Sequence, residues 1–134
     1  MNQTLMLYPM LALVGWTMTV LAMVGGRRLT SRLHPREFAL GESAAVPAVV
    51  SLPNRNFMNL LEVPVLFYVV SLTYYVTQQA NGTALALAWA FVVLRFVHSV
   101  VHLSYNNVMH RLGFFATGNF VLIALWVYLL VRLA

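Results

Sequence analysis

Two of the long apolar stretches in this chain carry polar and ionisable side chains that are spaced to lie on one face of a helix. The spacing is i, i+3 or i+4, and i+7, which stacks side chains along a helix. The two sets are Arg55, Asn59 and Glu62 in one stretch, and Arg95, His98 and His102 in the other. An ionisable group inside a bilayer costs about 2.5–3.5 kcal/mol or more, so such groups face a partner or a polar cavity. The pattern therefore predicts a buried polar pocket between two membrane-spanning helices.

The composition agrees with a membrane location for these helices. Of 134 residues, 61% are hydrophobic and 8% are charged, whereas soluble domains carry about 25% charged residues. A span needs about 20 apolar residues, so the chain predicts an all-α membrane protein, a four-transmembrane-helix bundle in a single domain over residues 1–134. The net charge of +5 comes from arginines at helix ends or inside spans, and we therefore predict no nucleic-acid partner. Since there is no cysteine, any sulfur chemistry must use a bound thiol.

We predict four helices and one long loop, with the helices over residues 5–24, 54–76, 83–107 and 114–133 and the loop over 27–53. Gly25 and Gly26 are expected to end the first helix, and Pro53 is expected to begin the second. Pro64 lies within the second helix and predicts a kink, which a membrane helix can accommodate. The first apolar stretch is too long for a signal peptide and has no basic residue before it, so we expect a transmembrane helix there.

The placement of the arginines predicts how the chain is oriented. Five of them lie in or beside the loop over 27–53, and Arg111 follows on the same side, whereas Arg132 alone marks the other side. The positive-inside rule then places the long first loop in the cytoplasm and both termini outside. The compact size and the use of arginine alone predict a bacterial inner-membrane protein.

Glu62 and Arg95 are expected to form an ion pair. At a rise of about 1.5 Å per residue, Glu62 lies roughly 13 Å from the cytoplasmic end of its helix and Arg95 roughly 18 Å from the opposite end of its own. Both would then lie at similar depth in a core of about 30 Å. The alternative is that the polar residues only hold the helices together, a role usually taken by serine, threonine or asparagine. Six polar residues on two stripes exceed that need and favour a ligand site.

His98 and His102 also form an H-x-x-x-H pair, a spacing that can bind zinc on one helix. A third ligand would have to be Glu62 or His110, and no H-E-x-x-H motif is present. We therefore predict no metal site.

Arginines at the membrane boundary allow two interpretations. Arg111 either anchors the topology or reaches into a pocket shared with a neighbouring subunit. Arg27 and Arg28 have the same two interpretations, and for these two residues taken alone the anchor is favoured.

Taken together, these motifs resemble those of the MAPEG family, the membrane-associated proteins of eicosanoid and glutathione metabolism. The matching residues are Arg55-x3-Asn59-x2-Glu62, Arg95-x2-His98-x3-His102 and then Arg111. The family includes microsomal glutathione transferases, leukotriene C synthase and microsomal prostaglandin E synthase. The resemblance covers the whole chain, including the four spans and the long first loop.

The resemblance implies a homotrimer of four-helix subunits that binds glutathione, its co-substrate, between adjacent subunits near the cytoplasmic side. The residues implied to hold glutathione are Arg55, Asn59, Glu62, Arg95, His98 and His102, together with one of Arg27 and Arg28, of which we take Arg28. Arg111 matches the arginine that stabilises the glutathione thiolate in the family's enzymes. Guanidinium groups suit the carboxylates of glutathione, and a guanidinium favours the thiolate, which is the nucleophile. A lipophilic electrophile would then arrive from the bilayer.

The chain also departs from some family members. His102 stands where some eicosanoid-processing members have tyrosine, Leu112 replaces the serine of prostaglandin E synthase, and Phe115 replaces a further tyrosine. Aspartate is absent from the chain, so an aspartate-assisted prostaglandin isomerase mechanism is excluded. The resemblance thus implies a glutathione transferase or peroxidase. The alternatives are a non-catalytic lipid-binding or scaffold protein of the same family, and a small proton-coupled exporter built around Glu62.

Overall fold

The computed structural model describes residues 2–134, which form helices without a β-strand. The five α-helices are α1 (Leu7–Thr30), α2 (Ala48–Leu61), α3 (Pro64–Val76), α4 (Gly82–Leu103) and α5 (Val108–Leu133). One 3-10 helix, η1 (Gln3–Met6), precedes α1. A second, η2 (Pro35–Phe38), lies in the loop between α1 and α2. Four helical segments are long and apolar enough to cross a membrane, with α2 and α3 sharing one span. The all-α class predicted from the sequence is therefore confirmed.

The first helix is longer than predicted, and the loop that follows it is shorter. The glycine pair at 25 and 26 lies inside α1, which continues to Thr30. Glycine costs only about 1 kcal/mol in a helix interior, and the flanking residues continue the helix past it. The predicted end of the first helix at residue 24 is thus wrong. Both predicted bounds of the loop over 27–53 are also wrong, because the connection between α1 and α2 covers only 31–47.

The second span starts earlier than predicted and is divided in two. Pro53 does not begin the helix but lies inside α2, which begins at Ala48 after Pro47. The kink expected from Pro64 is confirmed, because α2 ends at Leu61 and α3 begins at Pro64. Proline lacks the N–H group that would continue the helical hydrogen bonds. Between the two helices, Glu62 has φ −81° and ψ −96°, outside the helical range.

The turn between the last two helices also lies earlier than predicted. Helix α4 ends at Leu103 rather than at 107, and α5 begins at Val108 rather than at 114. Asn107 caps α5, since its Oδ1 accepts hydrogen bonds from the backbone N–H groups of Met109 and His110 at 3.0 and 3.1 Å. An asparagine side chain satisfies N–H groups that a helix start leaves unpaired, and so fixes this boundary.

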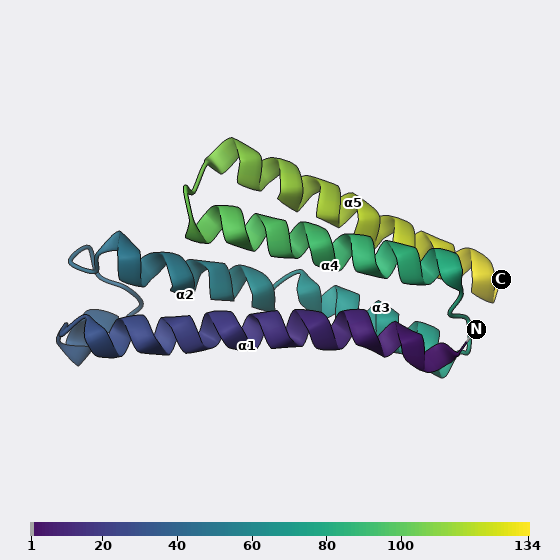
Figure 1. The fold of residues 1–134 in the computed structure, drawn as a ribbon, viewed down its shortest axis with the longest axis horizontal. Coiled ribbons are helices and arrows are strands. Elements are labelled where there is room, and N and C mark those ends of the chain that lie inside the picture. The colour runs from purple at the N-terminus through teal and green to yellow at the C-terminus, as the bar shows by residue number, and fades with distance from the viewer. Residues whose placement is uncertain (1) are drawn as a thin grey trace.

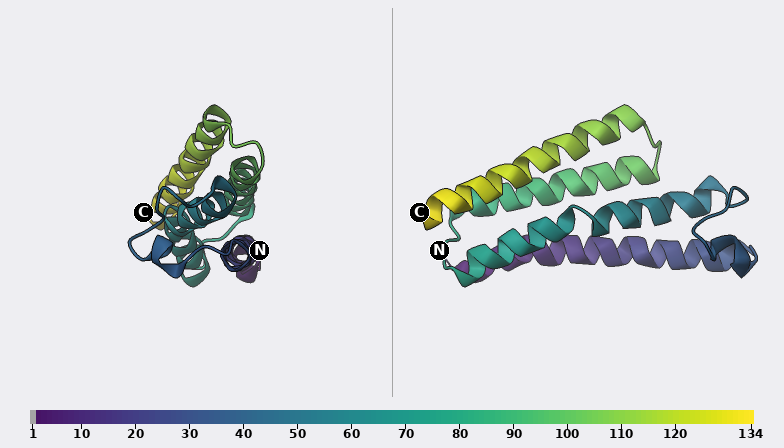
Figure 2. Two further views of the ribbon diagram at one scale, coloured as in Figure 1. Left: turned by 90° about the vertical axis from the view of Figure 1, so that its left-hand side faces the viewer. Right: turned by 180° about the vertical axis from the view of Figure 1, so that it is seen from behind.

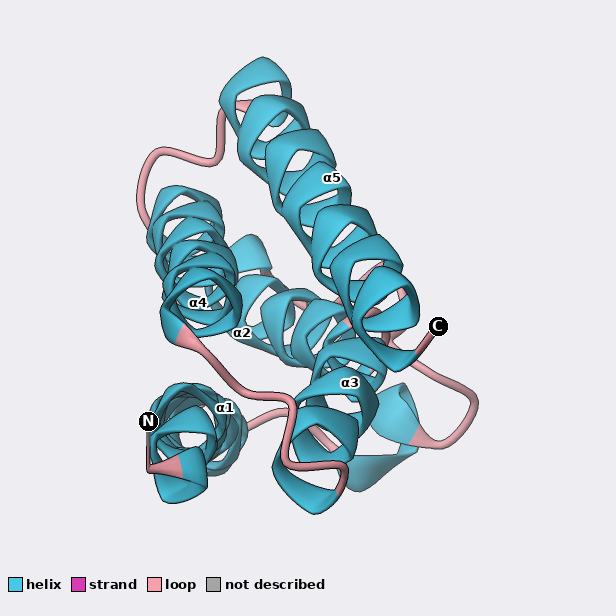
Figure 3. Ribbon diagram, turned by 90° about the vertical axis from the view of Figure 1, so that its right-hand side faces the viewer, coloured by secondary structure: helices cyan, strands magenta, loops and turns pink. Residues whose placement is uncertain are grey.

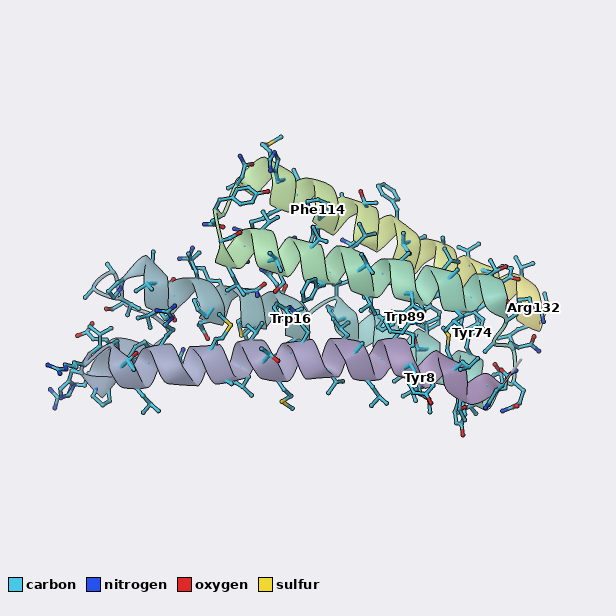
Figure 4. All side chains as sticks on the ribbon, viewed as in Figure 1. Tyr8, Trp16, Tyr74, Trp89, Phe114 and Arg132 are labelled. Atoms are coloured by element: carbon cyan, nitrogen blue, oxygen red, sulfur yellow. The ribbon has the colours of Figure 1, made fainter. Side chains whose placement is uncertain are left out.

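The helices form an elongated bundle in which both termini lie at one end (Figure 1). The loop over 31–47 and the turn between α4 and α5 lie at the opposite end, as the view from behind also shows (Figure 2). Seen from the end that holds the termini, α4 lies above α1, and α5 lies above α3 (Figure 3). Tyr74 and Arg132 lie near that end (Figure 4), where Arg132 donates to Gln79 Oε1 at 3.1 Å.

Aromatic and aliphatic side chains fill the centre of the bundle. Leu13, Phe67, Phe91 and Leu125 are each 0% exposed, and the rings of Phe67 and Phe91 stack with centroids 4.7 Å apart. Helix α5 diverges from α2 towards its own N-terminus (Figures 1 and 2). The turn that joins α4 and α5 lies at this divergent end of the bundle (Figure 1).

Candidate functional site

Three basic side chains of α4 lie on one buried face of the helix. Arg95 and His102 are each 1% exposed, and His98 is 5% exposed. Arginine is almost never this buried without a partner. Both Arg95 and His98 contact α5 through hydrogen bonds. The shared face predicted from the spacing is therefore turned into the protein rather than towards lipid.

Arg111 lies at the start of α5, opposite this face. Its backbone carbonyl oxygen lies 3.0 Å from Nδ1 of His98, which joins α4 to the first turn of α5. Its Nη1 donates a hydrogen bond of 2.7 Å to Oδ1 of Asn106. The first contact fixes the backbone of Arg111, and the second orients its guanidinium group.

A cavity of about 260 Å³ lies where α5 diverges from α2. The residues that line it are Asn59 of α2, His98 of α4, and Val108, Arg111, Leu112 and Phe115 of α5. Three residues singled out in the sequence, Asn59, His98 and Arg111, are thus brought together from three helices. The remaining wall is apolar, so the cavity combines a cation with an apolar surface.

Positive charge accumulates around this cavity. Arg55 on α2 is exposed and lies close enough to Arg111 and His102 to interact with both electrostatically. His98 interacts in the same way with Arg95 and Arg111. Cations gathered without matching carboxylates create a positive potential that attracts an anion. The cluster is therefore suited to a negatively charged ligand.

Several buried nitrogen atoms of the cluster have no hydrogen-bond partner within residues 2–134. They are Nε and Nη1 of Arg95, Nε2 of His98, both ring nitrogens of His102, and Nε of Arg111. A buried polar group left unpaired costs about 1–3 kcal/mol, and more if it is charged. Oxygen atoms of a ligand would accept hydrogen bonds from the guanidinium nitrogens of this set, and a donor group of the ligand would satisfy an acceptor nitrogen of a neutral histidine ring.

The ion pair predicted between Glu62 and Arg95 is wrong. Nη2 of Arg95 instead donates a hydrogen bond of 2.6 Å to Oδ1 of Asn119. The guanidinium carbon lies 4.7 Å from the ring centroid of Phe115 and 5.1 Å from that of Phe91. Glu62 is exposed and attracts Arg95 only at longer range. The acceptor for Arg95 is therefore an uncharged amide of α5 rather than the carboxylate of Glu62.

Arg28 lies apart from the cavity within this chain. It pairs with Glu42 at 3.6 Å, and its guanidinium carbon lies 4.8 Å from the ring centroid of Phe38. The end of α1 projects beyond the turn between α4 and α5 (Figure 1). Arg28 is therefore tied to the first loop.

The two histidines of α4 do not gather further metal ligands. Their ring centroids are 6.1 Å apart, and in the part of the chain that the structure describes no group of three histidine or glutamate side chains converges. His110, which the sequence suggested as a third ligand, bonds the hydroxyl group of Tyr105 at 2.9 Å.

Some contact residues of the site were missed in the sequence. Asn119 is the hydrogen-bond acceptor for Arg95. The sequence feature that could have pointed to Asn119 is an amide side chain inside an apolar stretch, the same feature that singled out Asn59. A second group joins three helices: the Oγ of Ser99 accepts hydrogen bonds from Nε1 of Trp16, at 2.8 Å, and from Nδ2 of Asn56. Asn56 follows Arg55 and Ser99 follows His98 in the sequence. Neither residue belongs to the two sets of polar residues spaced along a helix face, so the spacing did not reveal that they are buried.

Comparison with protein families gives one match. The family model described as "MAPEG family" matches residues 6–131, a range that includes every candidate residue above. No curated protein and no solved structure matches the chain. The match and the four apolar spans together identify an integral membrane protein.

Proposed function

Because the chain belongs to the MAPEG family, we propose that it is a membrane-bound glutathione transferase or peroxidase. It would activate the glutathione thiol for attack on lipophilic electrophiles or hydroperoxides. The observation that carries this proposal is the cavity in which Asn59, His98 and Arg111 meet. A thiol that enters it would lie beside a guanidinium and next to an apolar wall.

Arg111 supplies the chemistry that thiol activation needs. Its Nε atom is buried and unpaired within residues 2–134, while Nη1 is held by Asn106. A fixed guanidinium favours the thiolate over the thiol, and the thiolate is the nucleophile. Because its geometry is set before the reaction, the group stabilises developing negative charge without a cost for reorganisation.

The other basic residues are proposed to hold the charged ends of glutathione. Arg55, Arg95 and His102 supply hydrogen-bond donors near His98, which lines the cavity, and guanidinium forks bind carboxylates through paired hydrogen bonds. Asn59 supplies an amide from α2. Glu62 is exposed and forms no ion pair among the described residues, so its carboxylate is free to accept the ammonium group of glutathione.

A homotrimer would complete the site between adjacent subunits. Two of the proposed ligands, Arg55 and Glu62, are exposed on a single subunit, and Arg28 lies apart from the cavity. A neighbouring subunit that presents its own Arg28 would bring the missing cation to the open side. The site would lie near the cytoplasmic surface of a bacterial inner membrane, with the first loop in the cytoplasm, because arginine is concentrated at that end.

The second substrate is proposed to be lipophilic. Val108, Leu112 and Phe115 form the apolar part of the cavity wall, and Val108 and Leu112 are 67% and 55% exposed. An apolar molecule dissolved in the bilayer can reach such a surface without crossing water. No aspartate is present, so the proposed chemistry is conjugation or peroxide reduction rather than prostaglandin isomerisation.

The test is an ultraviolet difference spectrum of the detergent-purified protein titrated with glutathione. A saturable thiolate absorbance that is lost in Arg111→Ala, but kept in Arg132→Ala at the other end of the bundle, would support the enzyme. Saturable binding by calorimetry without a thiolate signal would instead support a non-catalytic binding or scaffold protein. No binding at all would exclude both and return Glu62 to the role of a proton carrier.

A further inference from the structure

The imidazole ring of His98 is held in one tautomer by its contact with α5. Its Nδ1 lies 3.0 Å from the backbone carbonyl oxygen of Arg111. A carbonyl oxygen can only accept a hydrogen bond, so Nδ1 must carry the hydrogen. In the neutral ring, the other nitrogen, Nε2, then has a free lone pair.

This lone pair has no protein partner within residues 2–134. Nε2 of His98 is buried and accepts no hydrogen bond, and the residue is 5% exposed while it lines the cavity. The ring also packs against Phe115, with centroids 5.9 Å apart, which limits its rotation. A fixed and unpaired acceptor therefore lies in the same cavity as the guanidinium of Arg111.

No other residue that lines this cavity in the described chain can take a proton near neutral pH. Arg111 has no acceptor atom, and the amide of Asn59 is not a base. The side chains of Val108, Leu112 and Phe115 carry no polar group. His98 is thus the proton acceptor that the cavity offers to a thiol held beside Arg111.

We propose that His98 is the general base that removes the proton of the glutathione thiol, an assignment that rests on the proposed function. The S–H bond breaks, its electron pair stays on sulfur beside Arg111, and the proton moves to Nε2 of His98. The thiolate then forms a bond to the electrophilic carbon of the second substrate. The electron pair displaced from that carbon, on a leaving group or at an activated double bond, takes the proton back from Nε2.

The charged and titratable groups around His98 are consistent with this cycle. Arg95 and His102 lie on its own helix, Arg111 faces it from α5, and Arg55 on α2 acts on both His102 and Arg111. Transfer of the thiol proton to His98 creates a cation and an anion together, so the net charge of the site stays constant. The imidazolium adds a positive charge among the neighbouring arginines, and the thiolate formed with it offsets that charge.

The first test is the variant His98→Asn, whose amide nitrogen can replace Nδ1 as donor to the carbonyl of Arg111 but leaves no base. We expect the rate of thiolate formation, followed by stopped-flow ultraviolet absorbance, to fall about 100-fold or more, the range for loss of a general base. Added imidazole should restore part of the rate. The matched control is His110→Asn, which removes an exposed histidine that bonds Tyr105 instead and should leave the rate unchanged.

The second test uses the unaltered protein, so it does not depend on the folding of a variant. If His98 retains the thiol proton, thiolate forms without release of a proton to the solvent, as measured by a pH indicator or by calorimetry in two buffers. Release of one proton for each thiolate formed, or an unchanged rate in His98→Asn, would overturn the assignment. If the unaltered protein forms no thiolate at all, the proposed function itself is wrong.

Discussion

Asn106 accepts a hydrogen bond of 2.7 Å from the guanidinium of Arg111 while its own backbone has φ 49°. Asparagine is one of the few residues with a side chain that adopts this left-handed conformation readily. The residue therefore has two roles at the turn between α4 and α5. It lets the chain reverse, and it holds the cation of the cavity in one orientation.

Replacement of Asn106 by glycine separates these two roles. Glycine keeps the left-handed backbone without strain but removes the acceptor of Arg111. We expect kcat with glutathione to fall about 10-fold or more, the equivalent of one hydrogen bond to a charged group, with little change in the Kd for glutathione. The control is Gln78→Gly, another left-handed position with φ 58° at the opposite end of the bundle. Equal losses in both variants would contradict a role for Asn106 in orienting Arg111.

We predict that Asn119 contributes to the stability of the fold only when Arg95 is present. In Asn119→Leu, Nη2 of Arg95 loses its acceptor, and the free energy of unfolding should fall by about 1–3 kcal/mol or more. The double variant Arg95→Met with Asn119→Leu removes both polar partners and should recover most of this loss. Thermal unfolding of the detergent-solubilised unaltered protein, the two single variants Asn119→Leu and Arg95→Met, and the double variant gives the three changes in free energy for a double-mutant cycle. A double variant that is as unstable as Asn119→Leu would show that the contact contributes little.

Two buried serines offer a direct comparison of satisfied and unsatisfied hydroxyl groups. Ser99 accepts hydrogen bonds from Trp16 and Asn56 and so joins α1, α2 and α4, whereas the buried Oγ of Ser71 has no partner in the described chain. We expect Ser99→Ala to lower the free energy of unfolding by about 1–3 kcal/mol for each donor left unpaired. Ser71→Ala should be neutral or stabilising, since it removes a buried polar group without a partner. Similar effects of the two substitutions on the melting temperature would argue against the three-helix junction.

Arg28 should affect ligand binding rather than stability. Its pair with Glu42 is partly exposed, with the arginine side chain 38% accessible, and exposed ion pairs contribute about 0–1 kcal/mol. If a neighbouring subunit presents Arg28 to glutathione, Arg28→Ala should raise the Kd about 10-fold, as expected for loss of one charge-assisted contact, with little change in Tm. Calorimetric titration measures the Kd, and Arg27→Ala is the matched control. If Arg27→Ala weakens binding and Arg28→Ala does not, the choice between these two arginines must be reversed.

The helical class and the two polar stripes could be predicted from the sequence because both depend on local spacing. Arg95, His98 and His102 share a face of α4 as their spacing requires. The helix ends were predicted less well. Gly25, Gly26 and Pro53 were taken as boundaries, yet all three lie inside helices, because an apolar segment in a membrane keeps its backbone hydrogen bonds wherever it can.

The partners of the polar residues could not be predicted from the spacing. Glu62 and Arg95 were placed at similar depth along straight helices, but Glu62 is exposed, and Arg95 donates its hydrogen bond to Asn119 on α5 instead. The contact of His98 with the carbonyl of Arg111 likewise depends on where α5 begins. Asn107 fixes that start by capping the helix.

Helical period and hydrophobicity are properties of neighbouring residues, so they suffice to predict membrane-spanning helices with basic residues on one face. Which of those residues meet depends instead on how the helices pack against one another. The divergence of α5 from α2 opens the cavity, and the contacts of α4 with α5 direct Arg111 and His98 into it. These outcomes depend on the packing of helices far apart in the sequence, where small shifts in helix ends and kinks change every contact between side chains.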